Sequence, residues 1–260
     1  MQIVFKEYDI YYNKNMKLVS LNIEFNRHHN LVLPFLKNES PDIICLQELL
    51  EEDFDMYKNE LGMEGIYRAV NFIYNDSHGE FYGKKEGLGI FSKSIINFGY
   101  FFHVGNIQRI ERSYEEYLKD ENKIKNRALL WVDIKDIDGE MYKFVNSHLT
   151  ITKDGKTTDF QLEMNQIFID QIKQLGEFVF CGDLNAPRGR EAYSRIAKEF
   201  KDNIPMKYSN SLDPILHRVK GLEYMVDGLF TTPTYIATNV ELKDGLSDHM
   251  AVIANISKFK

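Results

Sequence analysis

The chain has little cysteine, and this shortage argues against a disulfide framework. Cys45 and Cys181 are its only cysteines, and each stands inside an apolar run, as is typical of buried thiols in a reducing compartment. Long hydrophobic runs are also missing, because no apolar stretch approaches membrane-spanning length. Residues 1–15 lack the basic-then-apolar order of a signal peptide. We therefore expect a cytoplasmic protein with no membrane span.

The chain also has no excess of basic over acidic residues. Lys and Arg total 32 against 39 Asp and Glu, so the net charge is −7. Proteins that coat nucleic acid passively need a basic face, and the most basic segment, 122–127 (NKIKNR), is short and adjoins acids. A metal-dependent enzyme acting on a phosphate substrate stays compatible with this charge, because a bound cation supplies positive charge locally.

The 260 residues contain no linker-like composition, internal repeat or low-complexity run, which favours one domain. The clearest helix is expected at 158–176, with apolar residues near helical spacing and Gly176 as its C-cap. A short helix within 30–41 is expected to be interrupted by Pro34 or to begin near it. Another helix is expected around 189–200. Strands are predicted at 18–25, 42–48, 87–94, 128–135, 142–150, 178–185, 225–232 and 250–257.

The turn signals between these runs recur too often for a simple doubly wound sheet. Two packed sheets flanked by helices would bury this many β-branched and aromatic side chains. The spacing of the runs does not give the order in which the strands pair.

Six of the strand-like runs carry a polar side chain where the core pattern expects an apolar one. These residues are Asn22, Glu48, His148, Asp183 with Asn185, Asp227, and Asp248 with His249. Each has an ordinary alternative, such as a solvent-facing strand position, a helix start or a turn. A buried carboxylate is costly unless it is paired, hydrogen-bonded or bound to metal. Together the six runs favour a site around a hard divalent cation, which prefers oxygen ligands.

In these motifs the chain resembles the endonuclease/exonuclease/phosphatase superfamily of metal-dependent phosphodiesterases and phosphatases. The matching segments, in family order, are SLNIEFN, PDIICLQEL, GLGIFSK, VNSHLT, CGDLNAP, YMVDGLF and LSDHMAV. The resemblance implies an α/β (α+β) fold, a four-layer αββα sandwich of two packed mixed β-sheets flanked by helices, with the site at one rim. It also implies a single domain at 16–260, with 1–15 as an appended, loosely packed segment.

The resemblance implies a metal site and a water-activating group. Glu48 would be the principal ligand of Mg²⁺, with Mn²⁺ as a substitute, and Asn22 would lie nearby. Asp248 would be a further ligand, direct or through water. Asp183 would activate or orient the attacking water, and Asn185 would hold the scissile phosphate and the nucleophile in line.

Four further residues have implied roles toward the substrate. His249 would contact the phosphate or serve as base, oriented by Asp227. His148 would donate to a phosphate oxygen or to the leaving group. Arg127, at the start of a predicted strand, matches a phosphate-contacting arginine of some relatives.

The chain departs from the family pattern at two points. Glu163 stands where many relatives carry an arginine, three residues before a helical glutamine, and the glycine that often follows the first-motif asparagine is absent. Both leave the subfamily open and touch none of the predicted catalytic groups.

The sequence therefore predicts a monomeric Mg²⁺-dependent phosphoesterase, first of all a nuclease acting on DNA or RNA. The alternative is a phosphatase or phosphodiesterase of small-molecule or lipid phosphates, of the inositol phosphate or sphingomyelin type. A catalytically inactive binding protein is disfavoured by the complete set of acids and histidines. In segment 106–127, Tyr114 and Tyr117 form either a stacking wall for substrate or part of a solvated helix.

Overall fold

The computed structural model describes residues 15–74, 80–110, 113, 115–116 and 125–259. Of the segment expected to be an appended extension, residues 1–15, only Asn15 is among them. Tyr114 and Tyr117, the predicted stacking residues, lie outside the described part of the chain.

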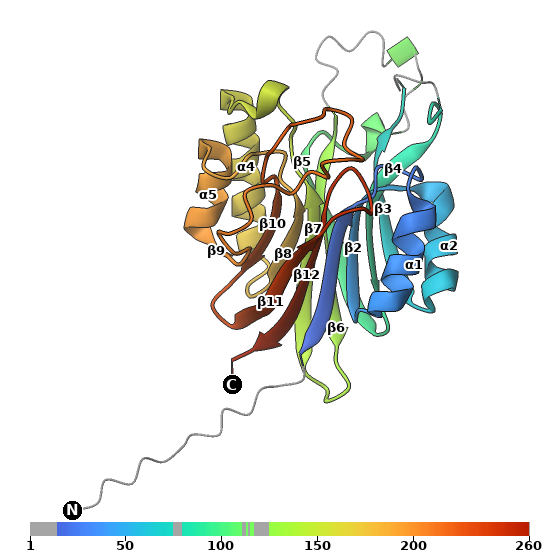
Figure 1. The fold of residues 1–260 in the computed structure, drawn as a ribbon, viewed down its shortest axis with the longest axis vertical. Coiled ribbons are helices and arrows are strands. Elements are labelled where there is room, and N and C mark those ends of the chain that lie inside the picture. The colour runs from blue at the N-terminus through green and yellow to red at the C-terminus, as the bar shows by residue number, and fades with distance from the viewer. Residues whose placement is uncertain (1–14, 75–79, 111–112, 114, 117–124, 260) are drawn as a thin grey trace, which may run out of the picture.

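Two mixed β-sheets form the centre of the molecule (Figure 1). In each sheet one neighbouring pair of strands is parallel, β1 with β2 and β7 with β8, and the other pairs are antiparallel. The first sheet has the order β11 (Tyr235–Lys243), β12 (Ala251–Lys258), β1 (Met16–Asn22), β2 (Ile43–Leu50), β4 (Lys85–Ser92), β3 (Glu64–Phe72). The second has the order β5 (Ile95–Val104), β6 (Arg127–Lys135), β7 (Met141–His148), β8 (Val179–Asp183), β10 (Asp227–Thr231), β9 (Lys201–Asp202).

Helices cover the outer face of each sheet. On the first sheet lie α1 (His29–Glu39) and α2 (Phe54–Leu61), and on the second lie α4 (Asp159–Lys173) and α5 (Glu191–Glu199) (Figure 1). Short 3₁₀ turns occur at Glu51–Asp53, Ile107–Arg109 and Lys153–Gly155. The four-layer αββα sandwich expected from the sequence is therefore confirmed.

Apolar side chains fill the three spaces between these layers. The cluster between the sheets includes Leu18 and Cys45 from the first sheet and Phe144 and Cys181 from the second. Both cysteines are fully buried and reduced, as expected, and burial together with Cys181 raises the pKa of the Cys45 thiol. Separate clusters lie beneath α4 and α5 and beneath α1 and α2.

The helices agree with the pattern except at a proline. Helix α4 begins after Thr158, whose Oγ1 accepts a hydrogen bond from the Gln161 backbone N–H as an N-cap. Helix α1, in contrast, runs through Pro34 without interruption, so the expected break there is wrong. Pro34 is the sixth residue of this helix, and its ring removes only one backbone donor, near the N-terminus.

The strands that sequence patterning missed are those at the edges of the sheets. Strands β3, β5, β9 and β11 each have a neighbour on one side only. Their residues are mostly half-exposed or exposed, and none of these strands alternates regularly between apolar and polar residues along its whole length.

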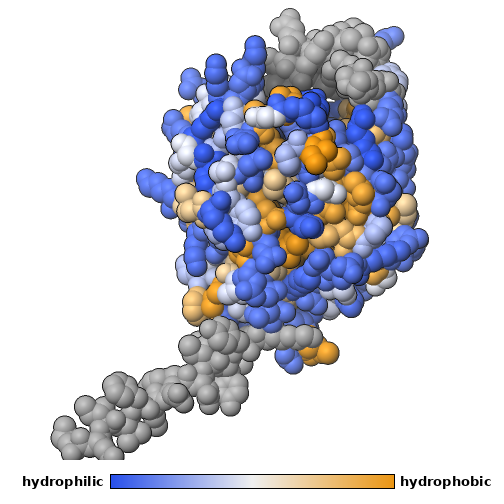
Figure 2. Space-filling view, in the orientation of Figure 1, coloured by the Kyte–Doolittle hydropathy of each residue, from blue (hydrophilic) through white to orange (hydrophobic). Residues whose placement is uncertain are grey.

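Among the described residues, no helix is both long and apolar enough to cross a bilayer. On the face shown in Figure 2, hydrophilic residues surround a central area in which hydrophobic residues gather.

His103 is an isolated polar group beneath helix α4. Its ring packs edge-on against Phe168, with 5.3 Å between the ring centroids. Neither ring nitrogen has a hydrogen-bond partner among the described residues, and the residue is only 5% exposed. Burial, and then the charge of Arg127, lower the pKa of His103 to about 3. The folded protein therefore holds this imidazole neutral.

We expect His103 to make the stability of the fold fall in mild acid. The unfolded chain takes up a proton at this residue below its ordinary pKa of 6.5, whereas the folded chain does so only near pH 3. The contribution of neutral His103 to the free energy of unfolding is complete above about pH 6.5. It decreases as the pH falls, by about 2 kcal/mol between about pH 7.5 and about pH 5. Urea unfolding of the parent and of His103→Phe at both pH values measures it. An equal loss in both proteins would contradict the prediction.

Candidate active site

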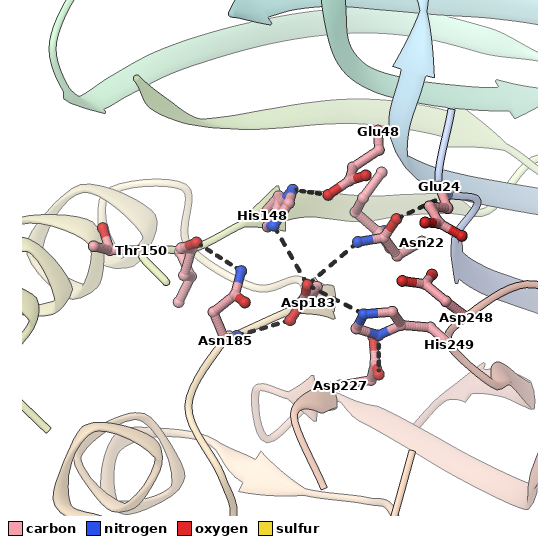
Figure 3. Close-up of polar contacts among 12 residues, drawn as sticks. Asn22, Glu24, Glu48, His148, Thr150, Asp183, Asn185, Asp227, Asp248 and His249 are labelled. Carbon is pink, nitrogen blue, oxygen red and sulfur yellow. Dashed lines mark hydrogen bonds and ion pairs between the residues drawn. The ribbon is translucent and has the colours of Figure 1, made fainter. Parts of the chain in front are cut away.

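The polar ends of the central strands meet at one rim of the sandwich. Strands β1 and β2 run parallel in one sheet, and β7 and β8 run parallel in the other. Asn22, His148 and Asp183 are the last residues of β1, β7 and β8. The Nδ2 of Asn22 lies 3.3 Å from Oδ2 of Asp183, so the carboxyl ends of strands from both sheets face each other. Figure 3 shows these side chains converging.

Gly182 lets the strand ends approach this closely. Its φ is 145°, and a Cβ at this position would lie 2.0 Å from the carbonyl oxygen of Ser147. Only glycine fits there. The register that results places Asp183 directly beside His148.

Asp183 is the centre of the site. Asp183 is 1% exposed, and its Oδ2 lies 3.3 Å from Nε2 of His148 and 3.8 Å from Nε2 of His249. Burial, opposed by His249 and reinforced by Asp227, raises the pKa of Asp183 to about 6. A carboxylate with this pKa accepts a proton readily near neutral pH.

Asn185 belongs both to a turn and to the site. Its backbone N–H donates to Oδ1 of Asp183 at 2.8 Å, which is an Asx-type turn. Its side-chain Nδ2 donates to the carbonyl oxygen of Leu149 at 3.1 Å, which directs the carboxamide toward the segment after His148. From the sequence, a turn and a functional site are alternative explanations of Asn185. In the structure this residue forms the turn and also lies in the candidate site.

Asp227 and His249 form a buried pair. Asp227 Oδ2 lies 2.9 Å from His249 Nδ1, and both residues are at most 7% exposed. Burial alone would lower the pKa of His249, but the carboxylates of Asp227, Asp183 and Asp248 outweigh it and hold that pKa well above the ordinary value. Burial, and then Arg127 and Lys125, hold the pKa of His148 well below its ordinary value. The pKa values of the two imidazoles are thus displaced in opposite directions.

Ser211, which the sequence did not single out, braces this pair. Its Oγ accepts hydrogen bonds from the backbone N–H groups of Val226 and Asp227 at 3.0 and 3.1 Å. Its carbonyl oxygen accepts from the N–H of Met250 at 2.7 Å, the residue after His249. One fully buried serine therefore ties together the two segments that carry the Asp–His pair.

Glu48 enters the site through an irregularity in strand β2. Its φ is 57°, and the pairing of β2 with β4 shifts register between Leu46 and Leu49. A left-handed glutamate costs about 1–3 kcal/mol, so the surrounding structure must impose it. The side chain is 21% exposed, and its Oε1 lies 3.9 Å from Nδ1 of His148.

The carboxylates next to Glu48 repel one another. Burial, and then Glu86 and Asp248, raise the pKa of Glu48 to about 7. Burial and Asp248 also raise the pKa of Glu24, whose backbone N–H donates to Oδ1 of Asn22 at 3.2 Å. A cation placed among these groups would relieve the repulsion.

Glu24 and Glu86 are site residues that the sequence did not identify. Glu24 follows Asn22 by two positions, and this spacing was a usable signal. Its backbone, however, is left-handed and lies beyond the strand. Glu86 is buried near the start of β4, where its Oε1 accepts from Nδ2 of Asn71 at 2.6 Å. It resembles any strand-flanking acid in the sequence, so no local signal marks it.

Arg127 lies at the start of β6 and is 3% exposed. Together with Glu86 and His148 it lines a small pocket. Burial lowers the pKa of Arg127, while Glu86, Asp183 and Glu48 oppose the change in that order. All the residues predicted for the site therefore come to the same rim of the sandwich.

A sequence model of the Endonuclease/Exonuclease/phosphatase family matches residues 19–249. The chain belongs to this family. No curated protein matches the chain in a sequence comparison.

Three solved structures illustrate how the family fold is shared. A family member from Bacteroides vulgatus is 19% identical, with a TM-score of 0.69, over 95% of this chain and 100% of its own. The human Nocturnin catalytic domain with bound sulfate is 14% identical, with a TM-score of 0.71, over 95% of each chain. The mannosyl-6-phosphatase of Bacteroides thetaiotaomicron is 15% identical, with a TM-score of 0.66, over 93% of this chain and 99% of its own. At these identities the likeness concerns the fold.

The donors at the rim fit a divalent cation of the kind common in this family. Glu48 and Asp248 supply carboxylate oxygens and Asn22 an amide oxygen, which are the ligand types of Mg²⁺. A second group, Asp183, Asp227 and His249, brings its ligand atoms within 4.8 Å of one another. In that group the Asp227–His249 hydrogen bond already uses one carboxylate oxygen and one ring nitrogen, so we favour the first group.

The two imidazoles should titrate in opposite directions from the ordinary histidine. In an NMR titration of the metal-free protein, we expect the His249 ring to stay protonated above pH 6.5 and the His148 ring to stay neutral below it. Asp227→Asn removes the nearest negative charge and should lower the pKa of His249. Asp244→Asn, a matched change at an exposed position, should leave it in place. Equal shifts in both variants would exclude a specific Asp227–His249 pairing.

Proposed function

We propose that the protein is a Mg²⁺-dependent phosphoesterase that hydrolyses phosphodiester bonds by attack of an activated water, with DNA or RNA as substrate. The observation that carries this proposal is the environment of Asp183. A carboxylate with a pKa of about 6 lies between a neutral and a protonated imidazole, beside a carboxamide. Hydrolysis of a phosphate ester needs a proton acceptor for water and fixed donors for the phosphate oxygens.

Each side chain has a role that its contacts support. Asp183 accepts the proton of the attacking water, and Asn185 orients that water and the phosphate. The protonated His249, held by Asp227, donates to a phosphate oxygen. His148 lies on the other side of Asp183, where it donates to a phosphate oxygen or to the leaving group, and Arg127 contributes a fixed positive charge.

Glu48, Asp248 and Asn22 would hold the metal. When bound there, Mg²⁺ would neutralise charge on the phosphate oxygens. Burial, and then neighbouring carboxylates, raise the pKa of both Glu48 and Glu24. The contribution of the carboxylates supports this placement, because a bound cation would offset their charge.

Exposed lysines beside the rim support a polymeric substrate. Lys125 immediately precedes the Arg127 segment and acts electrostatically on Glu48 and His148. Lys153 and Lys156 are exposed in the segment that follows His148. A nucleic acid extends past the scissile bond and reaches such flanking cations, whereas a small phosphate does not.

Replacing Glu48 tests the metal site. Glu48→Gln keeps the shape of the side chain but removes its charge, so we expect Mg²⁺ to bind at least about 10-fold more weakly, as measured by calorimetric titration and by the Mg²⁺ dependence of hydrolysis. Glu51→Gln, an exposed glutamate three positions later, is the matched control. If Glu48→Gln binds Mg²⁺ normally and Asp227→Asn does not, the metal lies at the Asp183–Asp227–His249 group instead.

A substrate panel tests the choice of nucleic acid. With Mg²⁺ present, we expect single- or double-stranded DNA or RNA to be hydrolysed faster than inositol phosphates, mannose 6-phosphate or sphingomyelin. Rising salt should slow hydrolysis of the polymer, because the flanking lysines are screened. Hydrolysis of the small or lipid phosphates alone would overturn the nuclease proposal and favour a phosphatase.

A further inference from the structure

A polar joint crosses the largely apolar space between the two sheets. Gln47 of β2 donates through Nε2 to Oδ1 of Asn146 of β7 at 2.7 Å, and lies 3.3 Å from Oγ of Ser20. Gln47 and Asn146 are fully buried, and Ser20 is 3% exposed. Burying amides in a core is costly unless they satisfy other polar groups, so the partners of Asn146 decide what this joint does.

Asn146 satisfies the backbone of the opposite sheet at its irregular point. Its Nδ2 donates to the carbonyl oxygens of Leu46 and Gly89, at 2.8 and 3.1 Å. Leu46 and Gly89 are the last pair of β2 and β4 before their register shifts. A side chain from one sheet thus completes the hydrogen bonding of the other where the ladder between β2 and β4 is broken.

These contacts fix the orientation of both amides. Two carbonyl acceptors face Nδ2 of Asn146, and rotating this amide by a half-turn would set its own oxygen against them. Oδ1 of Asn146 must therefore point toward Gln47, and Gln47 must donate to it through its NH₂ group. The hydrogen bonds therefore run in one direction. Gln47, the residue before Glu48, donates to Asn146, and Asn146 donates to the carbonyl oxygens of Leu46 and Gly89.

The joint also connects the two halves of the site. Gln47 immediately precedes Glu48, whose left-handed φ of 57° turns its side chain to the rim. Asn146 precedes His148 by two positions on β7 and so lies on the same side of that strand. Asn146 therefore lies between the segment of β2 that carries Glu48 and the end of β7 that carries His148.

We propose that Asn146 is a positioning residue, which holds the irregular segment of β2 so that Glu48 presents its carboxylate to the metal. The inference rests on the proposed placement of the metal at Glu48. Asn146 touches neither metal nor substrate. Without its two donors the carbonyls of Leu46 and Gly89 lose these hydrogen bonds, and the left-handed backbone at Glu48 is free to relax.

Direct metal binding separates positioning from general stability. We expect Asn146→Ala to weaken Mg²⁺ binding by about 10-fold or more, the range seen when groups that orient a metal ligand are removed, as measured by calorimetric titration without substrate. Val132→Ala is the matched control. It also removes a fully buried side chain of the same inter-sheet cluster, on neighbouring β6, and should lower Tm while keeping Mg²⁺ affinity within about twofold.

Two further variants, Glu48→Gln and Gln47→Leu, distinguish a wrong placement of the metal from a wrong role for Asn146. Glu48→Gln reports on the metal placement alone: if it binds Mg²⁺ normally, the proposed site fails and the inference fails with it. If Glu48→Gln loses affinity while Asn146→Ala keeps it, only the inference is overturned. If Asn146→Ala does not fold, Gln47→Leu replaces it with an apolar side chain that suits the core. The Tm increase on adding Mg²⁺ should then be smaller than in the parent, and an unchanged increase overturns the inference.

Discussion

The site is divided between two sheets, and the packing of these sheets against each other is the constraint on which its geometry depends. Asn22 and Glu48 come from one sheet, and His148, Asp183 and Asp227 come from the other. The apolar cluster between the sheets gives no directional preference. Direction comes from buried groups that hydrogen-bond between the sheets, such as the amides of Gln47 and Asn146.

Charge at the rim is arranged so that similar side chains have different states. Three carboxylates hold the pKa of His249 well above the ordinary value, whereas burial, and then Arg127 and Lys125, hold the pKa of His148 well below it. Among the acids, burial and mutual repulsion raise the pKa of both Asp183 and Glu48. Such separation of pKa values within one cluster is typical of sites that move protons.

Backbone strain is concentrated where the chemistry is proposed. Glu24, Phe25, Glu48 and Asn185 all have positive φ, and all lie at the rim or next to a rim residue. Asparagine adopts this conformation readily, but glutamate and phenylalanine do not. Distant parts of the chain contact the segments that carry these residues. The Asn146 side chain, for example, donates to the carbonyl oxygen of Leu46, two positions before Glu48.

The sequence by itself determined which strands carry the polar residues of the candidate site. The apolar runs that end in Glu48, His148 and Asp183, and the run that Asp227 interrupts, are visible locally, because burial and a polar residue leave a pattern of a few residues. Only the tertiary structure decided which edge strands complete the sheets, that Pro34 lies inside a helix, and that Glu24, Glu86, Ser211 and Asn146 support the site. Asn146 and its partner Gln47 are 99 positions apart. Such a contact depends on which strands face each other across the core, and residue spacing along the chain has no information about that.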